Sequence, residues 1–432
     1  HGGRVFHADL HGLRKEKYAM LDSSDIEHTE WTELNPASPN YYFVWEDADI
    51  RSEYERSWSL RDIFAPNGDP APGIVTTHDQ FAISWSREEA IAKVEQLLAT
   101  DSEDQARQLW RLCSQKQWDY RRAKQELADG TWRDKVVPIL YRPFDVRWTV
   151  YDRNVAVHRR ERASGHMLSA ANLALVCCRQ RSLGSESWAN VFAATGLIES
   201  CSISNKTKEI NYLFPLWLYP QPSDDLLERA SSERKPNLAP EFVEAVTAAV
   251  DKEPAPEEVL AWIYAILYAS SYRARYADFL KRDFPRVPLP PDAALFGQLV
   301  TIGHELIALH TMETVLPRVT GFPMAGSNEV DKVRWAVDAE PSPPAPLPAG
   351  EGNTGRVYIN TEQYFDAVPQ AVWDLHIGGY RVAEKWLKDR KGRHLTYDDR
   401  EHDPAVIAAL ARTLEWQAEL DAAIEAAGGW PL

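Results

Sequence analysis

The stretch from Val136 to Pro220 constrains the fold more than any other part of the chain, because short apolar segments alternate there with turn residues. Two of these segments are Pro138-Ile-Leu-Tyr and Trp148-Thr-Val-Tyr, and three more span 173–178, 191–194 and 210–219. Many short strands at close spacing are typical of a mixed or antiparallel sheet, and not of a doubly wound parallel one. We therefore expect an α+β fold in which such a sheet is flanked by helices.

Helical patterns lie on both sides of this stretch. Ser86 followed by Glu89 resembles a capping box and predicts a helix through Leu98, and an amphipathic pattern predicts further helix from Asp101 to Leu127. Near the N-terminus, the apolar segments at 41–45 and 81–84 indicate strands. Toward the C-terminus, helices are expected over 259–279, 295–315, 369–390 and 404–426.

Charge is strongly segregated along the chain. The 432 residues carry a net charge of −16, which argues against a protein that coats nucleic acid without sequence preference. Residues 116–220, however, contain 16 Lys and Arg against 10 Asp and Glu, and residues 381–393 contain six against two. Two basic islands therefore lie in an otherwise acidic chain, and each is either a solvated surface or a contact surface for a polyanion.

The sequence lacks the motifs of the common nucleotide-dependent and hydrolytic enzymes. It has no GxxxxGK[ST] loop, GxGxxG loop, HExxH helix or GxSxG turn. Adenine-N6 DNA methyltransferases need an Asn/Asp-Pro-Pro-aromatic turn, and the nearest string is Asn35-Pro36-Ala37-Ser38, without the second proline or the aromatic residue. Glu233-Arg234-Lys235 matches part of a nuclease pattern, but no strand is expected beneath it. We therefore expect no complete catalytic centre in this chain.

The cysteines and the apolar runs bear on the compartment. Cys113, Cys177, Cys178 and Cys201 lack the paired spacing of a zinc site, and we expect reduced thiols in a cytoplasmic protein. The sequence shows no signal peptide and no uninterrupted apolar run of the roughly 18 residues that span a bilayer, so no membrane partner is expected. His1 followed by two glycines suggests a piece of a longer polypeptide.

Basic and polar clusters occur where the expected strands and one helix end. Arginine can bind guanine through two hydrogen bonds, asparagine and glutamine can bind adenine in the same way, and lysine and threonine suit phosphates. For each cluster, the competing interpretation is an exposed loop or a structural ion pair, such as Arg142 with Asp145. The candidate DNA-contacting residues are Arg142, Arg147, Arg159, Arg160, Arg179, Gln180, Ser204, Asn205, Lys206, Thr207, Lys208, Lys388, Arg390, Lys391 and Arg393.

These candidates divide into two roles. The candidates for base edges in the major groove are Arg147, Arg159, Arg160, Arg179, Gln180 and Asn205. The candidates for phosphate contacts, which set register without reading sequence, are Lys206, Lys208, Lys388, Arg390 and Lys391. Before the second island, Gly378-Gly379 allows a close backbone approach or a sharp bend.

Long strings at the same places resemble a known family. From about residue 136 onward, the chain resembles the C-terminal specificity region of type ISP restriction-modification enzymes, in which one polypeptide joins nuclease, helicase-like ATPase, coupler, adenine methyltransferase and target-recognition domains. The strings are Tyr141-Arg-Pro-Phe-Asp, Ser204-Asn-Lys-Thr-Lys-Glu-Ile-Asn-Tyr-Leu-Phe-Pro-Leu, Tyr276-Ala-Asp-Phe-Leu-Lys-Arg-Asp-Phe-Pro-Arg and Gly378-Gly-Tyr-Arg-Val-Ala-Glu-Lys-Trp-Leu-Lys-Asp-Arg.

The resemblance implies three parts. Residues 1–85, which include a similar string from Val5 to Tyr18, would be the tail of a methyltransferase domain, and residues 86–135 a helical connector. Residues 136–432 would be the target-recognition domain, with a Pro-rich loop at 340–352. The implied partners are double-stranded DNA and a methyltransferase core, in the same polypeptide or in a separate subunit. That core would bind S-adenosylmethionine, and no cofactor is expected in this chain.

The resulting hypothesis is a module that reads DNA sequence and positions a target adenine for N6 methylation by a core outside this chain. Two alternatives stay open. The chain could be an incomplete or split adenine methyltransferase subunit, which would bind S-adenosylmethionine. It could instead be a protein-interaction scaffold without DNA binding, in which the acidic remainder and the helices at 259–279 and 404–426 are docking faces.

Overall fold

The computed structural model describes residues 3–36, 41–64, 66, 70–114, 116–182, 187–206, 209–220, 233–337 and 353–432. The chain divides into two compact units, His1–Glu55 and Arg56–Leu432, and each is described by itself.

The first unit is small. Strands β1 (Val5–His7) and β2 (Thr32–Leu34) pair antiparallel, with helix α1 (Arg14–Ser23) between them in sequence and α2 (Ala48–Glu55) after them. No residue of α1 is buried. The predicted strand at 41–45 is wrong, because these residues form loops and bends.

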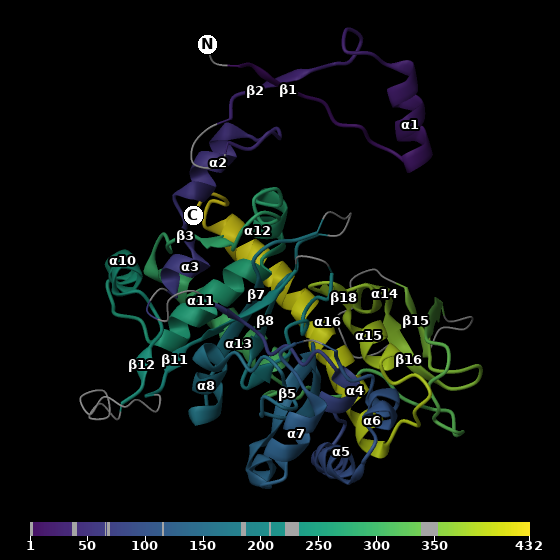
Figure 1. The fold of residues 1–432 in the computed structure, drawn as a ribbon. Helices are drawn as coiled ribbons and strands as arrows, with labels where there is room; N and C mark the ends of the chain where they lie inside the picture. The colour runs from purple at the N-terminus through teal and green to yellow at the C-terminus, as the bar shows by residue number, and fades with distance from the viewer. Residues whose placement is uncertain are drawn as a thin grey trace. The chain divides into compact units, whose positions relative to one another are not determined.

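Two sheets lie at the centre of the second unit (Figure 1). The first has the order β4 (Ala71–Pro72), β10 (Asn211–Pro215), β7 (Ala174–Cys178) and β8 (Val191–Ala194), with every neighbouring pair antiparallel. The second has the order β6 (Asp145–Val150), β5 (Val136–Arg142) and β9 (Leu197–Ile198), with β5 antiparallel to β6 and parallel to β9. The expected α+β fold with mixed and antiparallel sheets is therefore confirmed.

Further strands form smaller units. The third sheet is antiparallel and comprises β14 (Arg334–Val337), β15 (Thr354–Tyr358) and β16 (Tyr364–Pro369). The expected Pro-rich loop at 340–352 lies outside the described residues. The two-stranded pairs are β3 (Trp58–Ser59) with β13 (Arg286–Val287), β11 (Trp217–Leu218) with β12 (Lys235–Pro236), and β17 (His376–Ile377) with β18 (Tyr380–Arg381).

A helical layer precedes β5. Helix α5 (Arg87–Ala99) starts as predicted, since Ser86 Oγ accepts a hydrogen bond from Glu89 N at 3.1 Å. The expected helix from 101 to 127 is interrupted, because α6 (Glu103–Trp110) ends where Arg111 takes a left-handed conformation and α7 (Tyr120–Leu127) begins with a new cap at Asp119. These helices and the 3₁₀ helix η2 (Thr131–Lys135) enclose a hydrophobic cluster of their own.

The remaining helices surround the sheets, and α16 runs across them as the long yellow helix of Figure 1. Segment 81–84, expected as a strand, contributes instead to a short helix, and the helix expected over 369–390 is interrupted by the β17–β18 hairpin. These helices are α3 (Leu60–Ile63), α4 (Asp79–Ala82), α8 (Glu161–Ser169), α10 (Pro240–Val250), α11 (Pro256–Tyr268), α12 (Ser270–Arg275), α13 (Ala293–His310), α14 (Gln370–Trp373), α15 (Val382–Lys388) and α16 (Tyr397–Ala426).

Helix α13 is, among the described residues, the one helix long and apolar enough by length and composition to cross a membrane. No such run was expected from the sequence, and the helix packs against α11 and α16. Because 56% of its apolar window is buried inside the protein, core packing accounts for its composition.

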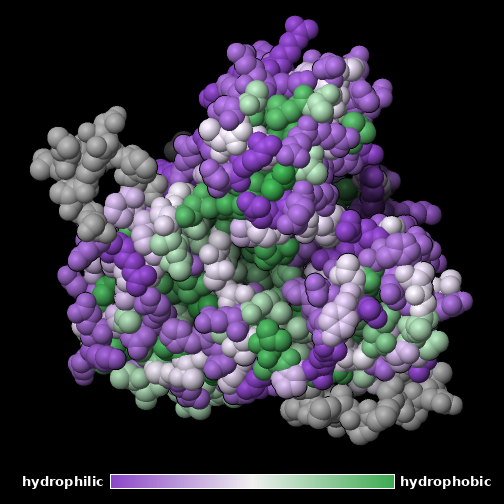
Figure 2. Space-filling model, turned by 90° about the horizontal axis from the view of Figure 1, so that it is seen from below, coloured by the Kyte–Doolittle hydropathy of each residue, from purple (hydrophilic) through white to green (hydrophobic). Residues whose placement is uncertain are grey.

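A cleft of about 800 Å³ opens between the second sheet and the C-terminal helices. Its lining includes Trp85, Val146, Thr195, Met312 and Arg393. The face of the molecule seen in Figure 2 is hollowed at its centre, where hydrophobic residues are exposed.

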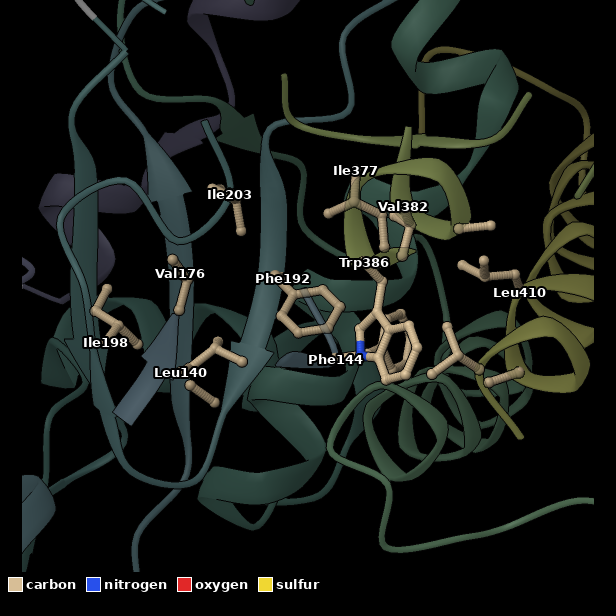
Figure 3. Close-up of a cluster of buried hydrophobic side chains, with 14 of the residues drawn as sticks. Leu140, Phe144, Val176, Phe192, Ile198, Ile203, Ile377, Val382, Trp386 and Leu410 are labelled. Carbon is tan, nitrogen blue, oxygen red and sulfur yellow. The ribbon is translucent and has the colours of Figure 1, made fainter. Parts of the chain in front are cut away.

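One hydrophobic core joins the sheets to the C-terminal helices. Phe144, Phe192 of β8 and Trp386 of α15 come together where the strands meet the helix (Figure 3), and the ring centroids of Phe144 and Phe192 are 5.3 Å apart. Burying aromatic side chains of this size stabilises a core by about 1.5–3 kcal/mol each. The core therefore fixes the strand ends that carry the candidate site.

Candidate functional site

Two loops that carry predicted site residues are held together by the carboxylate of Glu209, which is 3% exposed. Its Oε1 accepts a hydrogen bond from Ser182 N at 2.8 Å, in the loop after β7. Its Oε2 accepts from Ser204 Oγ at 2.6 Å and from Asn190 Nδ2 at 3.0 Å. A buried carboxylate with both oxygens engaged is a strong local constraint, so the loop after β7 and the loop before β10 form one structure.

Asn211, the first residue of β10, completes this constraint. Its Oδ1 accepts from Ile203 N at 2.6 Å and from Ser204 N at 3.2 Å, and its Nδ2 donates to the carbonyl of Glu209 at 2.8 Å. The side chain of Asn211 is fully buried. The backbone before β10 is therefore fixed from inside the protein, while Asn205 is exposed at its tip.

The β17–β18 hairpin packs directly on the same loop. Gly378 N donates to Ala189 O at 2.7 Å, and Gly379 N donates to Ile203 O at 2.9 Å. A Cβ atom on Gly378 would lie 1.9 Å from Ile203 O, and the residue has a φ of +59°. Only glycine fits here, which confirms the predicted close backbone approach.

The structure places Arg142 in the protein interior. Its Nη1 donates to Glu199 Oε2 at 2.9 Å and to Cys201 O at 3.2 Å, and its guanidinium lies 3.8 Å from the centre of the Tyr141 ring. Arg142 therefore forms a structural ion pair with Glu199, and not with Asp145, the partner considered from the sequence. Burial raises the pKa of Glu199, and the Arg142 guanidinium acts in the opposite direction.

Arg147 and Arg390 are also buried in ion pairs. Asp145, which is almost completely buried, accepts from Arg147 Nη2 at 2.8 Å and from Arg390 Nη2 at 3.3 Å, and Arg390 Nε donates to Asp399 at 3.1 Å. This network ties the β5–β6 hairpin to α15 and α16. Arg147 and Arg390 therefore help to hold the fold, and the base contact and the phosphate contact expected from the sequence stay predictions.

Trp85 connects this network to the cleft. The guanidinium carbons of Arg147, Arg393 and Arg390 lie 3.8, 4.2 and 5.0 Å from the centre of its ring. Arg393 is exposed, whereas the other two are buried. The indole therefore orients an exposed arginine at the mouth of the cleft by cation–π attraction.

The other predicted residues divide by exposure. Ser204 is buried and structural, and Thr207 and Lys208 lie outside the described residues. We define the loop surface as Arg179, Gln180, Asn205 and Lys206, the solvent-accessible residues on the two joined loops. Arg179 Nε lies 2.8 Å from Asp283 Oδ1.

The helix-end surface is the exposed basic group at the end of α15 and just after it, and comprises Lys388, Lys391 and Arg393. Lys388 Nζ lies 2.9 Å from Glu384 Oε1. Arg159 and Arg160 lie at the start of α8, where Arg159 pairs with Glu161. In the part of the chain that the structure describes, no hydrogen bond or ion pair links these two arginines to either surface.

A family model for the type ISP C-terminal specificity domain matches residues 68–420. The chain belongs to the type ISP C-terminal specificity domain family. This specificity domain has no match among the curated proteins searched.

Solved structures agree with this assignment at the level of the fold. A nuclease-deletion mutant of the type ISP enzyme LlaGI with a DNA substrate mimic is 17% identical, with a TM-score of 0.63 over 96% of this chain and 33% of that one. A DrdV–DNA complex is 18% identical, with a TM-score of 0.63 over 94% of this chain and 41% of the other. The type ISP enzyme LlaBIII bound to DNA is 15% identical, with a TM-score of 0.64 over 90% and 26%. This specificity domain therefore spans well under half the length of each of these three chains.

Proposed function

We propose that the chain recognises a specific double-stranded DNA sequence within a type ISP-like restriction-modification enzyme. Membership of the specificity-domain family supports this function, as do the three structural neighbours, which were each solved with DNA or a DNA mimic. The observation that carries the proposal is the fixing of the two loops by Glu209 and Asn211, with polar and basic side chains left at their tips.

The loop surface provides the groups that base reading needs. The amides of Gln180 and Asn205 suit adenine, and Arg179 suits guanine if it exchanges Asp283 for a base edge. Rigid placement of these side chains matters, because loops that become ordered only on binding pay an entropic cost that lowers the affinity for DNA. Arg160, which is exposed, and Arg159 are further candidates for base contact.

Phosphate contacts are assigned to Lys206 and to the helix-end surface. Basic groups on the helix-end surface would neutralise backbone charge and set the register of the duplex, a salt-dependent contribution. A methyltransferase core outside this chain would then flip the target adenine and use S-adenosylmethionine as methyl donor. In this proposal the chain contributes recognition, and the chemistry belongs to that core.

The exposed apolar side chains of the first unit favour a role for it in docking to a protein partner. It exposes large apolar residues, including Phe6, Trp31, Phe43 and Trp45, and α1 buries none of its own. Apolar side chains exposed in this number usually mark an interaction surface. The partner we propose is the methyltransferase core, in the same polypeptide or a separate subunit.

Selection from a random duplex pool tests the main proposal. At about physiological salt, the full chain should enrich a short motif, and a variant that carries Gln180→Ala and Asn205→Ala should not enrich the same motif. Retention of DNA without any enrichment, by a correctly folded chain, would contradict sequence reading by this chain alone.

A further inference from the structure

Arg273, in α12, carries a buried charge that has no ion-pair partner among the described residues. The residue is 8% exposed, its Nε donates to Leu267 O at 2.6 Å, and its guanidinium lies 4.6 Å from the Tyr268 ring. Its Nη2 is buried and has no hydrogen-bond acceptor in the part of the chain that the structure describes. Among the described residues, no carboxylate oxygen lies within 4.0 Å of it. Burial of an unpaired charge is costly, so this position lacks a negative partner.

The nearby acid is already engaged elsewhere. Burial lowers the pKa of Arg273, and the charge of Asp421 opposes that shift. However, Asp421 Oδ1 accepts hydrogen bonds from Ser271 N at 2.9 Å and from Ser271 Oγ at 2.6 Å. An arginine remains protonated at neutral pH even when it is buried, so the charge persists.

Arg273 lines a pocket of about 280 Å³ that several polar side chains share. Ser187, Ser270, His376 and Gln417 also line it. Asp374 is the acidic residue in the described lining, and its Oδ1 lies 3.4 Å from Arg381 Nη2, which offsets its charge. The pocket therefore combines the Arg273 guanidinium, which has an unused hydrogen-bond donor, with hydroxyl, amide and imidazole groups.

We propose that this pocket binds a phosphate-type oxyanion, with Arg273 as its principal ligand. A guanidinium matches phosphate oxygens in geometry and charge, and serine hydroxyls can donate to the remaining oxygens. The anion could be free phosphate or a phosphodiester of the DNA backbone, since both present the same group. The pocket also lies beside Ala189, which accepts from Gly378 N, so that a bound anion would brace the segment on which the β17–β18 hairpin rests.

Thermal unfolding of the full chain in phosphate and in chloride of equal ionic strength tests the site. We expect phosphate to raise the Tm saturably, by about 2–4 °C at concentrations well above its Kd. Arg273→Gln should lose this response, although it also removes the hydrogen bond to Leu267 O and could unfold the chain. A second pair of variants therefore keeps the proposal testable.

Ser270→Asp places a carboxylate three residues before Arg273, at the exposed start of α12, where acidic residues are well tolerated. This variant would supply the missing counter-ion, so we expect a higher Tm in chloride and no phosphate response. Ser270→Asn is the neutral control of similar size, and because its amide can also donate a hydrogen bond to the anion, it should keep a phosphate response that Ser270→Asp loses.

Duplex DNA titrations in phosphate-free buffer distinguish the two sources. An affinity that Ser270→Asp lowers at least five-fold relative to Ser270→Asn assigns the anion to the DNA backbone. An unchanged affinity together with the phosphate effect on Tm assigns it to free phosphate. If neither the Tm nor the affinity differs between these conditions and variants, the pocket binds no phosphate and the proposal is wrong. The Tm arm does not depend on sequence recognition, so its failure is separate from failure of the proposed function.

Discussion

The carboxylate of Glu209 accepts a hydrogen bond from the hydroxyl of Ser204 at 2.6 Å, within the turn that leads into β10. Because the other oxygen accepts from Ser182 N at 2.8 Å, one side chain joins two loops that are separated by two strands in sequence. The residues that hold the loops are thus buried, and the residues that face solvent at their tips are different ones. Substitutions at the tips can therefore change what is bound without changing the scaffold.

Glu209→Gln should uncouple the two loops. An amide has one acceptor oxygen and places an NH₂ group against donors, so we expect a loss of about 1–3 kcal/mol in the free energy of unfolding. Sequence enrichment from a duplex pool should also weaken. Glu253→Gln, at an exposed position, is the control and should change neither property. Equal unfolding curves and equal enrichment for both variants would contradict the role given to Glu209.

Asn205→Ala should relax DNA preference at a single position. Loss of one bidentate amide contact should lower the binding preference for one base over the others by about 1–3 kcal/mol at that position. The other positions should keep their preferences. Comparing binding to duplexes that differ at one base pair measures this effect. A uniform loss of affinity for all duplexes would instead indicate a phosphate contact at Asn205.

Charge reversal of Lys388 and Lys391 together should weaken DNA binding without changing base preference. Removing two phosphate contacts should make the dependence of log K on log salt shallower by about two. Lys252→Glu reverses an exposed lysine that belongs to neither surface and is the control. If the slope is the same in all three proteins, the helix-end surface does not contact phosphates through these lysines.

Asp145→Asn should destabilise the fold strongly. The change leaves Arg147 and Arg390 buried with less negative charge, and losing one partner of a buried ion pair costs about 3–5 kcal/mol. Asp398→Asn, at an exposed residue nearby, should have little effect. Urea unfolding of the two variants provides the comparison, and similar midpoints would show that the network adds little stability.

Strand positions were largely predictable from the sequence, because alternation and turn residues are local signals. The segments at 138–141, 148–151, 173–178 and 191–194 coincide with or overlap β5, β6, β7 and β8. Helix breaks were less visible, since the left-handed Arg111 and the hairpin at Gly378 depend on contacts elsewhere in the chain.

Composition alone could not predict which basic residues of the candidate site are exposed and which are buried in ion pairs. A basic residue beside a strand end can be exposed or can pair with a distant acid, and Arg390 pairs with Asp145 across 245 residues. Glu209 and Asn211 were missed as organisers for a related reason. Simple alternation in 209–212 would turn Ile210 inward, whereas Ile210 is exposed and Asn211 is fully buried. Asn211 is buried because its side chain accepts hydrogen bonds from loop backbone N–H groups, which would otherwise lack acceptors, and this requirement overrides the hydrophobic alternation.

Asp403 should make the stability of the fold depend on pH. It is fully buried in α16, and burial raises its pKa from 3.8 to about 7, while Arg390 opposes this shift and Asp399 adds to it. The folded state therefore binds a proton more tightly than the unfolded state. The resulting stabilisation is complete below about pH 4 and is lost as the pH rises toward 7, by up to about 1.4 kcal/mol for each pH unit.

Asp403→Asn removes this proton linkage, because the amide is neutral at every pH. We expect the variant to match the parent near pH 4 and to exceed its free energy of unfolding at pH 8. Comparing the two proteins at each pH also cancels the opposite contribution of His310, whose pKa burial lowers to about 3. Asp398→Asn is again the exposed control and should follow the parent at every pH. If the difference between Asp403→Asn and the parent is the same at pH 4 and pH 8, the pKa of Asp403 is not raised on folding.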